Sequence, residues 1–287
     1  MPRLVELPER GRLLAATDLQ GNLRDFRRVV ELFEQAAAEP DGAVLVITGD
    51  LVHGPEIPAS EWPEYLGTFY HADSPTLLRE AQELLRRHPG RVHFLLGNHE
   101  HAHIGGPVVS KFFTDEAQRL EQLLGAARTR EIHKWFDSWP LMAVARRARL
   151  LLLHAAPSAQ IGSAADLEAI SLRPPARAPD QEEVWLLDSV LAGILWSRTA
   201  TGARARALLR AIDPDLRVAI YGHDVAREGY VIEREPLLCF STSFGCFDGD
   251  KLYLDWDLAR RARSARHVAR GGLRPLHPSA APVFRSR

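Results

Sequence analysis

The sequence predicts an α/β fold, and three observations support this. Five short apolar runs each stop at a polar turn, stretches of helical periodicity separate several of them, and the chain of 287 residues, 46% apolar and 25% charged, is long enough for a sizeable core. Near-continuous apolar runs are typical of strands covered on both faces. Strands that alternate with helices predict a sheet whose ligands bind outside the carboxyl ends of its strands.

The five predicted strands all end at residues that can hold a ligand. In chain order they cover residues 13–16, which precede Asp18 and Gln20; residues 43–48, which precede Gly49 and Asp50; residues 92–96, which precede Gly97, Asn98, His99 and Glu100; residues 150–153, which precede His154; and residues 218–221, which precede Gly222 and His223.

Helices are predicted between these strands. Asn22, with Asp25 three residues later, can cap a helix whose apolar residues Phe26, Val29 and Phe33 recur at helical spacing. Further helical patterns cover approximately residues 76–88, 114–127, 182–195 and 204–212. Residues 55–75, with four prolines and several aromatic residues, predict a long loop or insertion, and the proline-rich residues 171–180 predict another loop.

Composition excludes several classes of protein. No window has the roughly 18 uninterrupted apolar residues that a membrane span needs, and the charged residues 1–12 do not resemble a signal peptide. Cys239 and Cys246 are the only cysteines, which is too few for a disulfide framework or a four-cysteine zinc site. We therefore expect a soluble, cytoplasmic protein without a membrane partner.

Charge divides the chain into two parts. The formal net charge is −1, but residues 260–287 hold eight arginines and no acidic residue, which leaves about −9 on the first 259 residues. The arginine-rich end contains glycine and proline and shows little apolar periodicity. We therefore predict one domain over residues 1–258 and a basic, disordered tail over residues 259–287. An anchor for nucleic acid or anionic lipid is the alternative for this tail.

The polar residues at the strand ends together predict a metal site. Each alone is common in turns and caps, but five successive strand ends supply metal-competent groups: Asp18 and Gln20, Asp50, Asn98 with His99, His154, and His223. A mixed set of oxygen and imidazole ligands suits Mn²⁺, Fe or Zn²⁺. One carboxylate shared between two ions is how a two-metal site is assembled.

These motifs resemble a known family. Gly97-Asn98-His99-Glu100, preceded by Gly49-Asp50 and followed by His154 and His223, resembles the calcineurin-like metallophosphoesterase superfamily, and within it the phosphoprotein phosphatases. Trp139-Pro140-Leu141, Leu195-Trp196-Ser197 and the segment that begins at Phe240 follow in the family's order. The resemblance spans approximately residues 12–257.

The resemblance implies a four-layered α/β/β/α sandwich that holds two divalent ions, with Mn²⁺ the first expectation and Fe or Zn²⁺ the alternatives. It implies that water activated by the ions attacks phosphorus and that His99 protonates the leaving oxygen. It also assigns ligands: Asp18 and, with a changed side chain, Gln20 for the first ion, Asp50 as the bridge, and Asn98, His154 and His223 for the second ion.

Three departures from the family pattern affect the expected chemistry. Gln20 stands where the family has a histidine ligand, and an amide oxygen binds softer metals less well. His53 replaces the carboxylate that orients the catalytic histidine, and Gly54 replaces an arginine that grips phosphate. Ala155 and Ala156 replace a pair of glycines. Asn98 and Arg198 are then the candidates for holding the phosphate, because a guanidinium can form two hydrogen bonds with it.

Several functions stay open at this point. The family members most similar to this chain act on phosphoserine and phosphothreonine, so a phosphorylated protein is the expected partner. Hydrolysis of small phosphoesters or dinucleoside polyphosphates is an alternative. The changes at Gln20, His53 and Gly54 also allow a phosphatase-like binding module with weakened catalysis. Nucleic acid is expected as a partner only through the arginine-rich tail.

Overall fold

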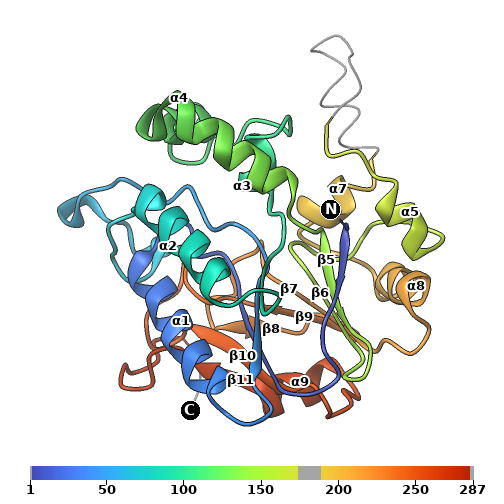
Figure 1. Ribbon diagram of the computed structural model, residues 1–287. Helices are drawn as coiled ribbons and strands as arrows, with labels where there is room; N and C mark the ends of the chain where they lie inside the picture. The colour runs from blue at the N-terminus through green and yellow to red at the C-terminus, as the bar shows by residue number, and fades with distance from the viewer. Residues whose placement is uncertain (1, 174–188, 285–287) are drawn as a thin grey trace.

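Two stacked sheets lie between two layers of helices. The structure is a computed structural model that describes residues 2–173 and 189–284. In Figure 1, helices α1 (Leu23–Ala37) and α2 (Ser74–Arg87) cover the left side, and α5 (Ala164–Glu168) and α8 (Gly202–Ile212) cover the right side. The predicted four-layered α/β/β/α sandwich is therefore confirmed.

The first sheet has the order β11-β10-β2-β3-β4. Its strands are β11 (Leu273–Pro275), β10 (Leu252–Asp257), β2 (Arg12–Ala16), β3 (Ala43–Ile47) and β4 (Val92–Phe94). The last three run parallel because α1 and α2 provide the crossovers between them. Their carboxyl ends therefore lie at one edge of the sheet.

The second sheet has the order β1-β5-β6-β7-β9-β8. Its strands are β1 (Leu4–Glu6), β5 (Met142–Ala145), β6 (Leu150–Leu153), β7 (Val218–Tyr221), β9 (Leu237–Phe240) and β8 (Tyr230–Val231). Strands β6, β7 and β9 run parallel to one another. The carboxyl ends of β6 and β7 supply the two histidines of the predicted site.

The core between the sheets follows from the alternation of side chains along each strand. In β2, Leu13 and Ala15 pack among residues of the opposite sheet, whereas Leu14 and Ala16 pack in the cluster that contains the helices. All four side chains are buried. Strands covered on both faces in this way account for the near-continuous apolar runs in the sequence.

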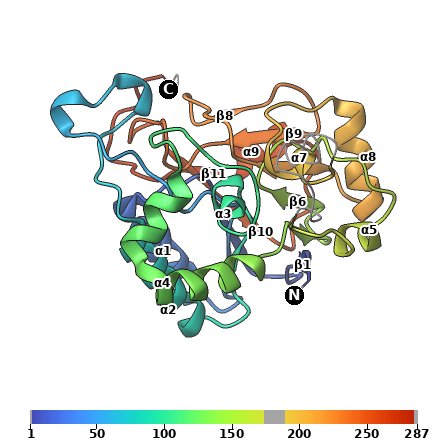
Figure 2. The ribbon, with the colours of Figure 1, turned by 90° about the horizontal axis from the view of Figure 1, so that it is seen from above.

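Two helices cross the edge of the sandwich where the strand ends meet. Helix α3 (Asn98–Ala102) directly follows the loop after β4, and the longer α4 (Glu116–Asp137) packs against it. Figure 2, which looks down on this edge, shows α3 near the centre with α4 on one side and α7 (Ala192–Leu195) on the other. These helices surround the candidate site.

The five predicted strands are all present, and helices lie at four of the predicted positions. The predicted loop over residues 55–75 contains two short 3₁₀ turns, η1 (Ala59–Glu61) and η2 (Glu64–Leu66), before α2 begins at Ser74. The predicted helix over residues 182–195 lies partly outside the described residues, and its described end contains α7. Most of the predicted loop over residues 171–180 also lies outside them.

The prediction of a disordered tail is wrong. Residues 265–275 form helix α9 (Ala265–Gly272) and strand β11, which pairs with β10. Val268 and Leu276 are fully buried, and Arg260 stacks over the ring of Trp256. The short, arginine-rich pattern concealed an amphipathic helix whose small apolar face packs against the sheets.

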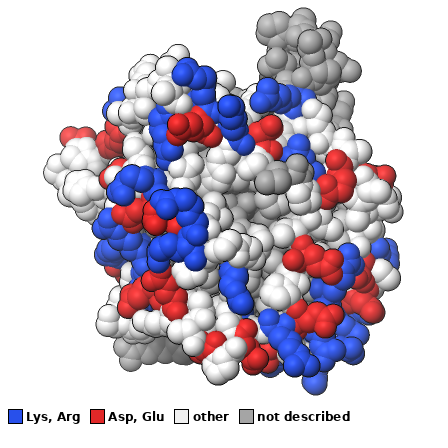
Figure 3. Space-filling view, in the orientation of Figure 1, with Lys and Arg blue, Asp and Glu red and all other residues white. Residues whose placement is uncertain are grey.

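The surface has mixed charge on the face shown in Figure 3, where basic and acidic side chains are interspersed. Within residues 2–173 and 189–284, no helix is both long enough and apolar enough to cross a bilayer.

Candidate active site

The backbone is strained where the predicted site residues lie. Six non-glycine residues of the described chain have positive φ, and five of them are Asp18 (46°), Gln20 (40°), Asp50 (52°), His53 (66°) and His223 (65°). This conformation is unfavourable for side chains other than glycine, and such residues cluster at functional sites. The strand ends are therefore shaped to present these side chains rather than to minimise local energy.

Four predicted ligands of the second ion converge on one point. Nε2 of His154 lies 2.9 Å from Oδ1 of Asn98, 3.1 Å from Nδ1 of His223 and 3.4 Å from Oδ1 of Asp50. Nδ1 of His154 lies 2.9 Å from the carbonyl oxygen of Thr48. Because a carbonyl only accepts, Nδ1 of His154 carries a hydrogen, so the neutral form of the ring presents its lone pair at Nε2.

This geometry fits a bound cation. Ligand atoms that share one ion at about 2.0–2.1 Å lie about 2.9–3.4 Å from one another, which is the range of the three distances at His154. A hydrogen bond from Nδ1 of His223 to Nε2 of His154 is the alternative to a cation. It would leave the oxygens of Asn98 and Asp50 facing the lone pair of His154 without a hydrogen or cation between them. A cation satisfies all four groups together.

The predicted first-ion ligands lie beside this centre. Both carboxylate oxygens of Asp18 accept from the backbone N–H of His223, and the backbone N–H of Gln20 donates to the carbonyl oxygen of Asp50. Oε1 of Gln20 is buried without a hydrogen-bond partner. A buried amide oxygen in this position is costly unless a cation or water satisfies it.

The pKa values of this group favour metal binding. Burial, and then the nearby charge of Asp50, raise the pKa of Asp18 to about 6. A cation bound here would offset both effects, because it stabilises the ionised carboxylate. Burial opposes charge on Asp50, but the imidazoles of His154 and His99 outweigh it and lower its pKa. Burial and His154 lower the pKa of His223 to about 3, so its ring is neutral and its lone pair is available.

Glu100 holds the loop that carries Asp50. Its carboxylate accepts from the backbone N–H groups of Asp50, Leu51 and Gly97, at 2.9, 2.8 and 3.2 Å. These contacts join the ends of β3 and β4 into one rigid unit. Glu100 thus supports the predicted bridging ligand without facing the convergence point itself.

His99 lies between the convergence point and a second buried group. Its Nε2 is 3.7 Å from Oδ2 of Asp50, while its Nδ1 is 3.1 Å from Nδ1 of His53 and 3.3 Å from Oε2 of Glu116. Burial opposes charge on His99, but Asp50 and Glu116 outweigh it and raise its pKa. An imidazole with a raised pKa can hold a proton for a leaving oxygen.

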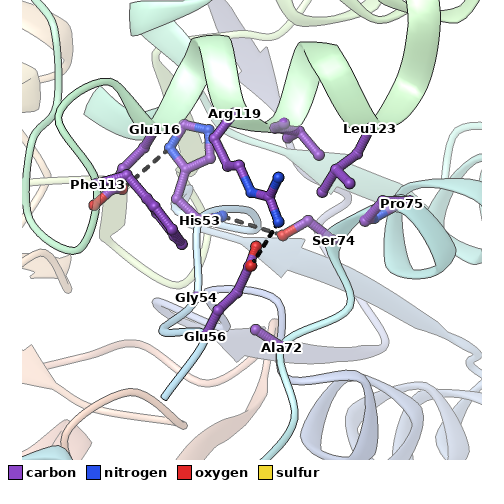
Figure 4. A pocket seen from close by; sticks show the side chains of 11 residues that line it. His53, Gly54, Glu56, Ala72, Ser74, Pro75, Phe113, Glu116, Arg119 and Leu123 are labelled. Atoms are coloured by element: carbon purple, nitrogen blue, oxygen red, sulfur yellow. Dashed lines mark hydrogen bonds and ion pairs between the residues drawn. The ribbon is translucent and has the colours of Figure 1, made fainter.

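Glu116 is a site residue that the sequence analysis missed. It begins α4, where it reads as an ordinary first-turn acid, but its side chain is buried and Oε1 accepts from the backbone N–H groups of Lys111 and Phe112. Figure 4 shows its carboxylate facing the His53 ring, 3.5 Å from Nδ1. Both residues line a cavity of about 40 Å³. The sequence carried no signal that would place it beside His99.

The predicted phosphate-holding residues differ in their placement. Asn98 lies at the convergence point, whereas Arg198 is exposed and pairs with Asp224 at 2.8 Å. Gly54 has no room for the arginine of the family pattern, because a Cβ there would lie 2.1 Å from the carbonyl oxygen of Gln20. Lys111, which the sequence analysis did not single out, interacts electrostatically with Asp50 and Asp18.

The fold and the converging oxygen and imidazole groups define a metal-dependent phosphoesterase. Residues 11–227 of the chain match the sequence pattern of the calcineurin-like phosphoesterase family. The chain therefore belongs to the calcineurin-like phosphoesterase family, a metal-dependent family of phosphoester hydrolases.

Solved structures show the same fold at low sequence identity. A protein serine/threonine phosphatase from Saccharomyces cerevisiae with similarity to human phosphatase PP5 aligns with a TM-score of 0.59 and 17% identity, over 88% of this chain and 76% of that one. A cold-active protein-tyrosine phosphatase from a psychrophilic Shewanella species aligns with a TM-score of 0.52 and 15% identity, over 89% of this chain and 77% of that one. No curated protein matches the sequence.

Proposed function

We propose that this protein is a phosphoprotein phosphatase of the serine/threonine type, with two divalent ions, Mn²⁺ first among them. The observation that carries the proposal is the convergence of Asn98, His223 and Asp50 on the lone pair of His154 at distances of 2.9–3.4 Å. The oxygen-rich first site, with Asp18 and Gln20, favours a hard ion such as Mn²⁺ over a soft one.

The chain's own residues divide the remaining work. When bound, the ions would supply an activated water and neutralise charge on the phosphoryl oxygens. His99 holds a proton on the side of Asp50 and donates it to the leaving oxygen. Glu116 stabilises the charged form of His99, which the neutral ring of His53 cannot do, because burial and then the charge of His99 lower the pKa of His53 well below its usual value.

Phosphate recognition in this proposal combines three residues. Asn98 contributes its amide, and Arg198 and Lys111 contribute positive charge near the site. The charge of Arg198 acts on His223, and that of Lys111 acts on Asp50. These two cations compensate for the arginine that Gly54 cannot provide.

The choice of a phosphoprotein substrate rests on two supports. The ordered motifs of the chain resemble those of the phosphoprotein phosphatases. Two proteins with this fold are also named as protein phosphatases, one for serine/threonine and one for tyrosine. Small phosphoesters and dinucleoside polyphosphates are therefore comparison substrates in the test.

The test measures metal content and hydrolysis together. We expect two ions per chain after Mn²⁺ loading, and release of phosphate from phosphoserine or phosphothreonine peptides faster than from phosphotyrosine peptides, an aryl phosphate or a dinucleoside tetraphosphate. His99→Asn should lower kcat by about 10²–10⁴-fold with unchanged metal content. His88→Asn, the same change at the end of α2, is the control.

Other outcomes have clear meanings. Faster cleavage of a small phosphoester or a dinucleoside polyphosphate would move the substrate assignment to that class and contradict the phosphoprotein proposal. One ion or none, without turnover across several metals and substrates, would indicate a phosphatase-like binding module instead of an enzyme.

A further inference from the structure

A row of side chains leads from buried His99 through buried His53 and His103 to the half-buried Glu121 on α4. Nδ1 of His99 lies 3.1 Å from Nδ1 of His53, and Nε2 of His53 lies 2.9 Å from Nε2 of His103. Nδ1 of His103 then lies 2.8 Å from Oε1 of Glu121. These four residues, which we call the imidazole row, come from three separate segments of the chain.

The far end of the row can only accept hydrogen bonds. His103 and His133 both contact Oε1 of Glu121, at 2.8 and 2.7 Å. The hydrogen bond from His103 is the main reason that the pKa of Glu121 is lowered, so this side chain is an ionised carboxylate. An ionised carboxylate has no hydrogen to donate. His103 must therefore place its hydrogen on Nδ1.

The two middle rings are neutral, so each carries a single hydrogen. Burial lowers the pKa of His103 despite the opposing effect of Glu121, and burial lowers the pKa of His53 further. With its hydrogen on Nδ1, His103 presents a lone pair at Nε2. His53 must then donate from Nε2 across the 2.9 Å contact, which leaves a lone pair on its own Nδ1.

The order of donors and acceptors along the row also determines the position of a hydrogen on His99. Because Nδ1 of His53 accepts, Nδ1 of His99 carries a hydrogen, which points toward His53 at 3.1 Å and Glu116 at 3.3 Å. Glu116 does not reverse this order. Its Oε2 is 3.5 Å from Nδ1 of His53, which is longer than the 2.9 Å contact between His53 and His103.

We propose that Glu121 is a positioning residue that fixes, through His103 and His53, which ring nitrogen of His99 carries its permanent hydrogen. With a hydrogen held on Nδ1 toward His53, Nε2 is the nitrogen that His99 presents to Asp50, at 3.7 Å. The catalytic benefit of this arrangement rests on the proposed function; the hydrogen positions themselves do not.

The test reads the hydrogen positions directly. Long-range ¹H–¹⁵N correlation spectra of the full chain, labelled with ¹⁵N-histidine and loaded with diamagnetic Mg²⁺, distinguish the two neutral forms of each ring. Single His→Gln variants assign the signals. We expect hydrogen on Nε2 of His53 and on Nδ1 of His103. Hydrogen on Nδ1 of His53 in the unaltered protein would overturn the proposal.

Variants of Glu121 test its control of the row. Glu121→Leu removes the acceptor, so His53 and His103 should show mixed forms, and kcat should fall about 10–100-fold with KM within twofold. Glu121→Gln keeps an acceptor oxygen and should retain the original forms. Glu131→Leu, at an exposed carboxylate of α4 that pairs with Arg128, is the matched control.

The results separate this proposal from the proposed function. Unchanged ring forms in a folded Glu121→Leu protein would overturn the role of Glu121, even if the enzyme is active. The expected ring forms in a protein without turnover would support the imidazole row and contradict the proposed function.

Discussion

Asp25 lies fully buried near the start of α1, and its charge is compensated by residues far along the chain. Its carboxylate is 2.6 Å from Nζ of Lys251, 2.8 Å from Nε2 of His277 and 2.7 Å from Oγ of Ser243. Burial alone would raise the pKa of Asp25, but His277 and Lys251 outweigh it and lower the pKa well below its usual value. From the sequence, Asp25 is only a helix-capping residue.

Asp25→Asn should destabilise the protein at neutral pH. Lys251 is also fully buried, and Asp248, 3.0 Å from its Nζ, would still compensate part of its charge. The loss should therefore approach but not exceed the cost of about 3–5 kcal/mol for breaking a buried ion pair. Chemical unfolding at pH 7 would measure this loss. Asp215→Asn, at an exposed acid, should change the free energy of unfolding by less than about 0.5 kcal/mol.

The same pair predicts a pH dependence. The folded-state pKa of Asp25 lies below the unfolded value of about 3.9, so its ionised form stabilises the fold above about pH 4 and this contribution is lost as the pH falls further. The difference in stability between the natural protein and Asp25→Asn should therefore narrow below about pH 4. A constant difference down to pH 2 would contradict this account.

At the scale of elements, short helix α3 joins the two halves of the site. It places Asn98 and His99 at the strand ends, while Glu100 ties it to the loop after β3.

Five strands were predictable because strands buried on both faces have nearly continuous apolar sequences. Helix α3 was not, since five residues are too few for helical periodicity. The half-buried β10 alternates in the manner of a strand and carried a usable signal that was not recognised.

Gly97→Ala should damage the metal site through the packing of these elements. A Cβ at this position would lie 2.4 Å from both the backbone nitrogen and Oδ1 of Asp50, and 2.7 Å from Oε2 of Glu100. We expect metal affinity to fall about 10–100-fold as the Asp50 loop shifts. Metal titration followed by calorimetry would measure the change.

Gly162→Ala is the control for this variant, because a Cβ there would meet only the end of the Asp166 side chain, at 3.1 Å. Unchanged metal affinity in Gly97→Ala would show that the Asp50 loop can move without loss of binding.

At the scale of the whole molecule, the candidate site could be located from the sequence but not completed. The ligands were predictable because parallel strands bring their carboxyl ends to one edge of a sheet. Glu116, His103 and Glu121 were not, since they lie on α4 or directly after α3, and the packing of these helices over that edge depends on contacts across the entire fold. The arginine-rich end was misjudged for a similar reason: its apolar residues are few, yet β10 and α1 give them partners.

Truncation after residue 258 should therefore destabilise the protein. The deletion removes α9, β11 and His277, and buried residues such as Val268 and Leu276 contribute about 1.5–3 kcal/mol each. We expect Tm to fall by at least about 6 °C relative to the full chain. Truncation after residue 278, which retains these groups, should cause a smaller change. If the full chain and the protein that ends at residue 258 have equal Tm values, the prediction of a disordered tail would be supported instead.

The contact between Asp25 and His277 spans 252 residues of sequence. At a synthesis rate of about 5–20 residues per second, His277 leaves the peptidyl-transferase centre roughly 10–50 s after Asp25 does. Throughout that interval the carboxylate of Asp25 has its local partner Asn22 but lacks His277. The first sheet therefore cannot close in its final form until the segment around His277 has been translated and has left the exit tunnel, and the nascent chain has to stay unaggregated until then.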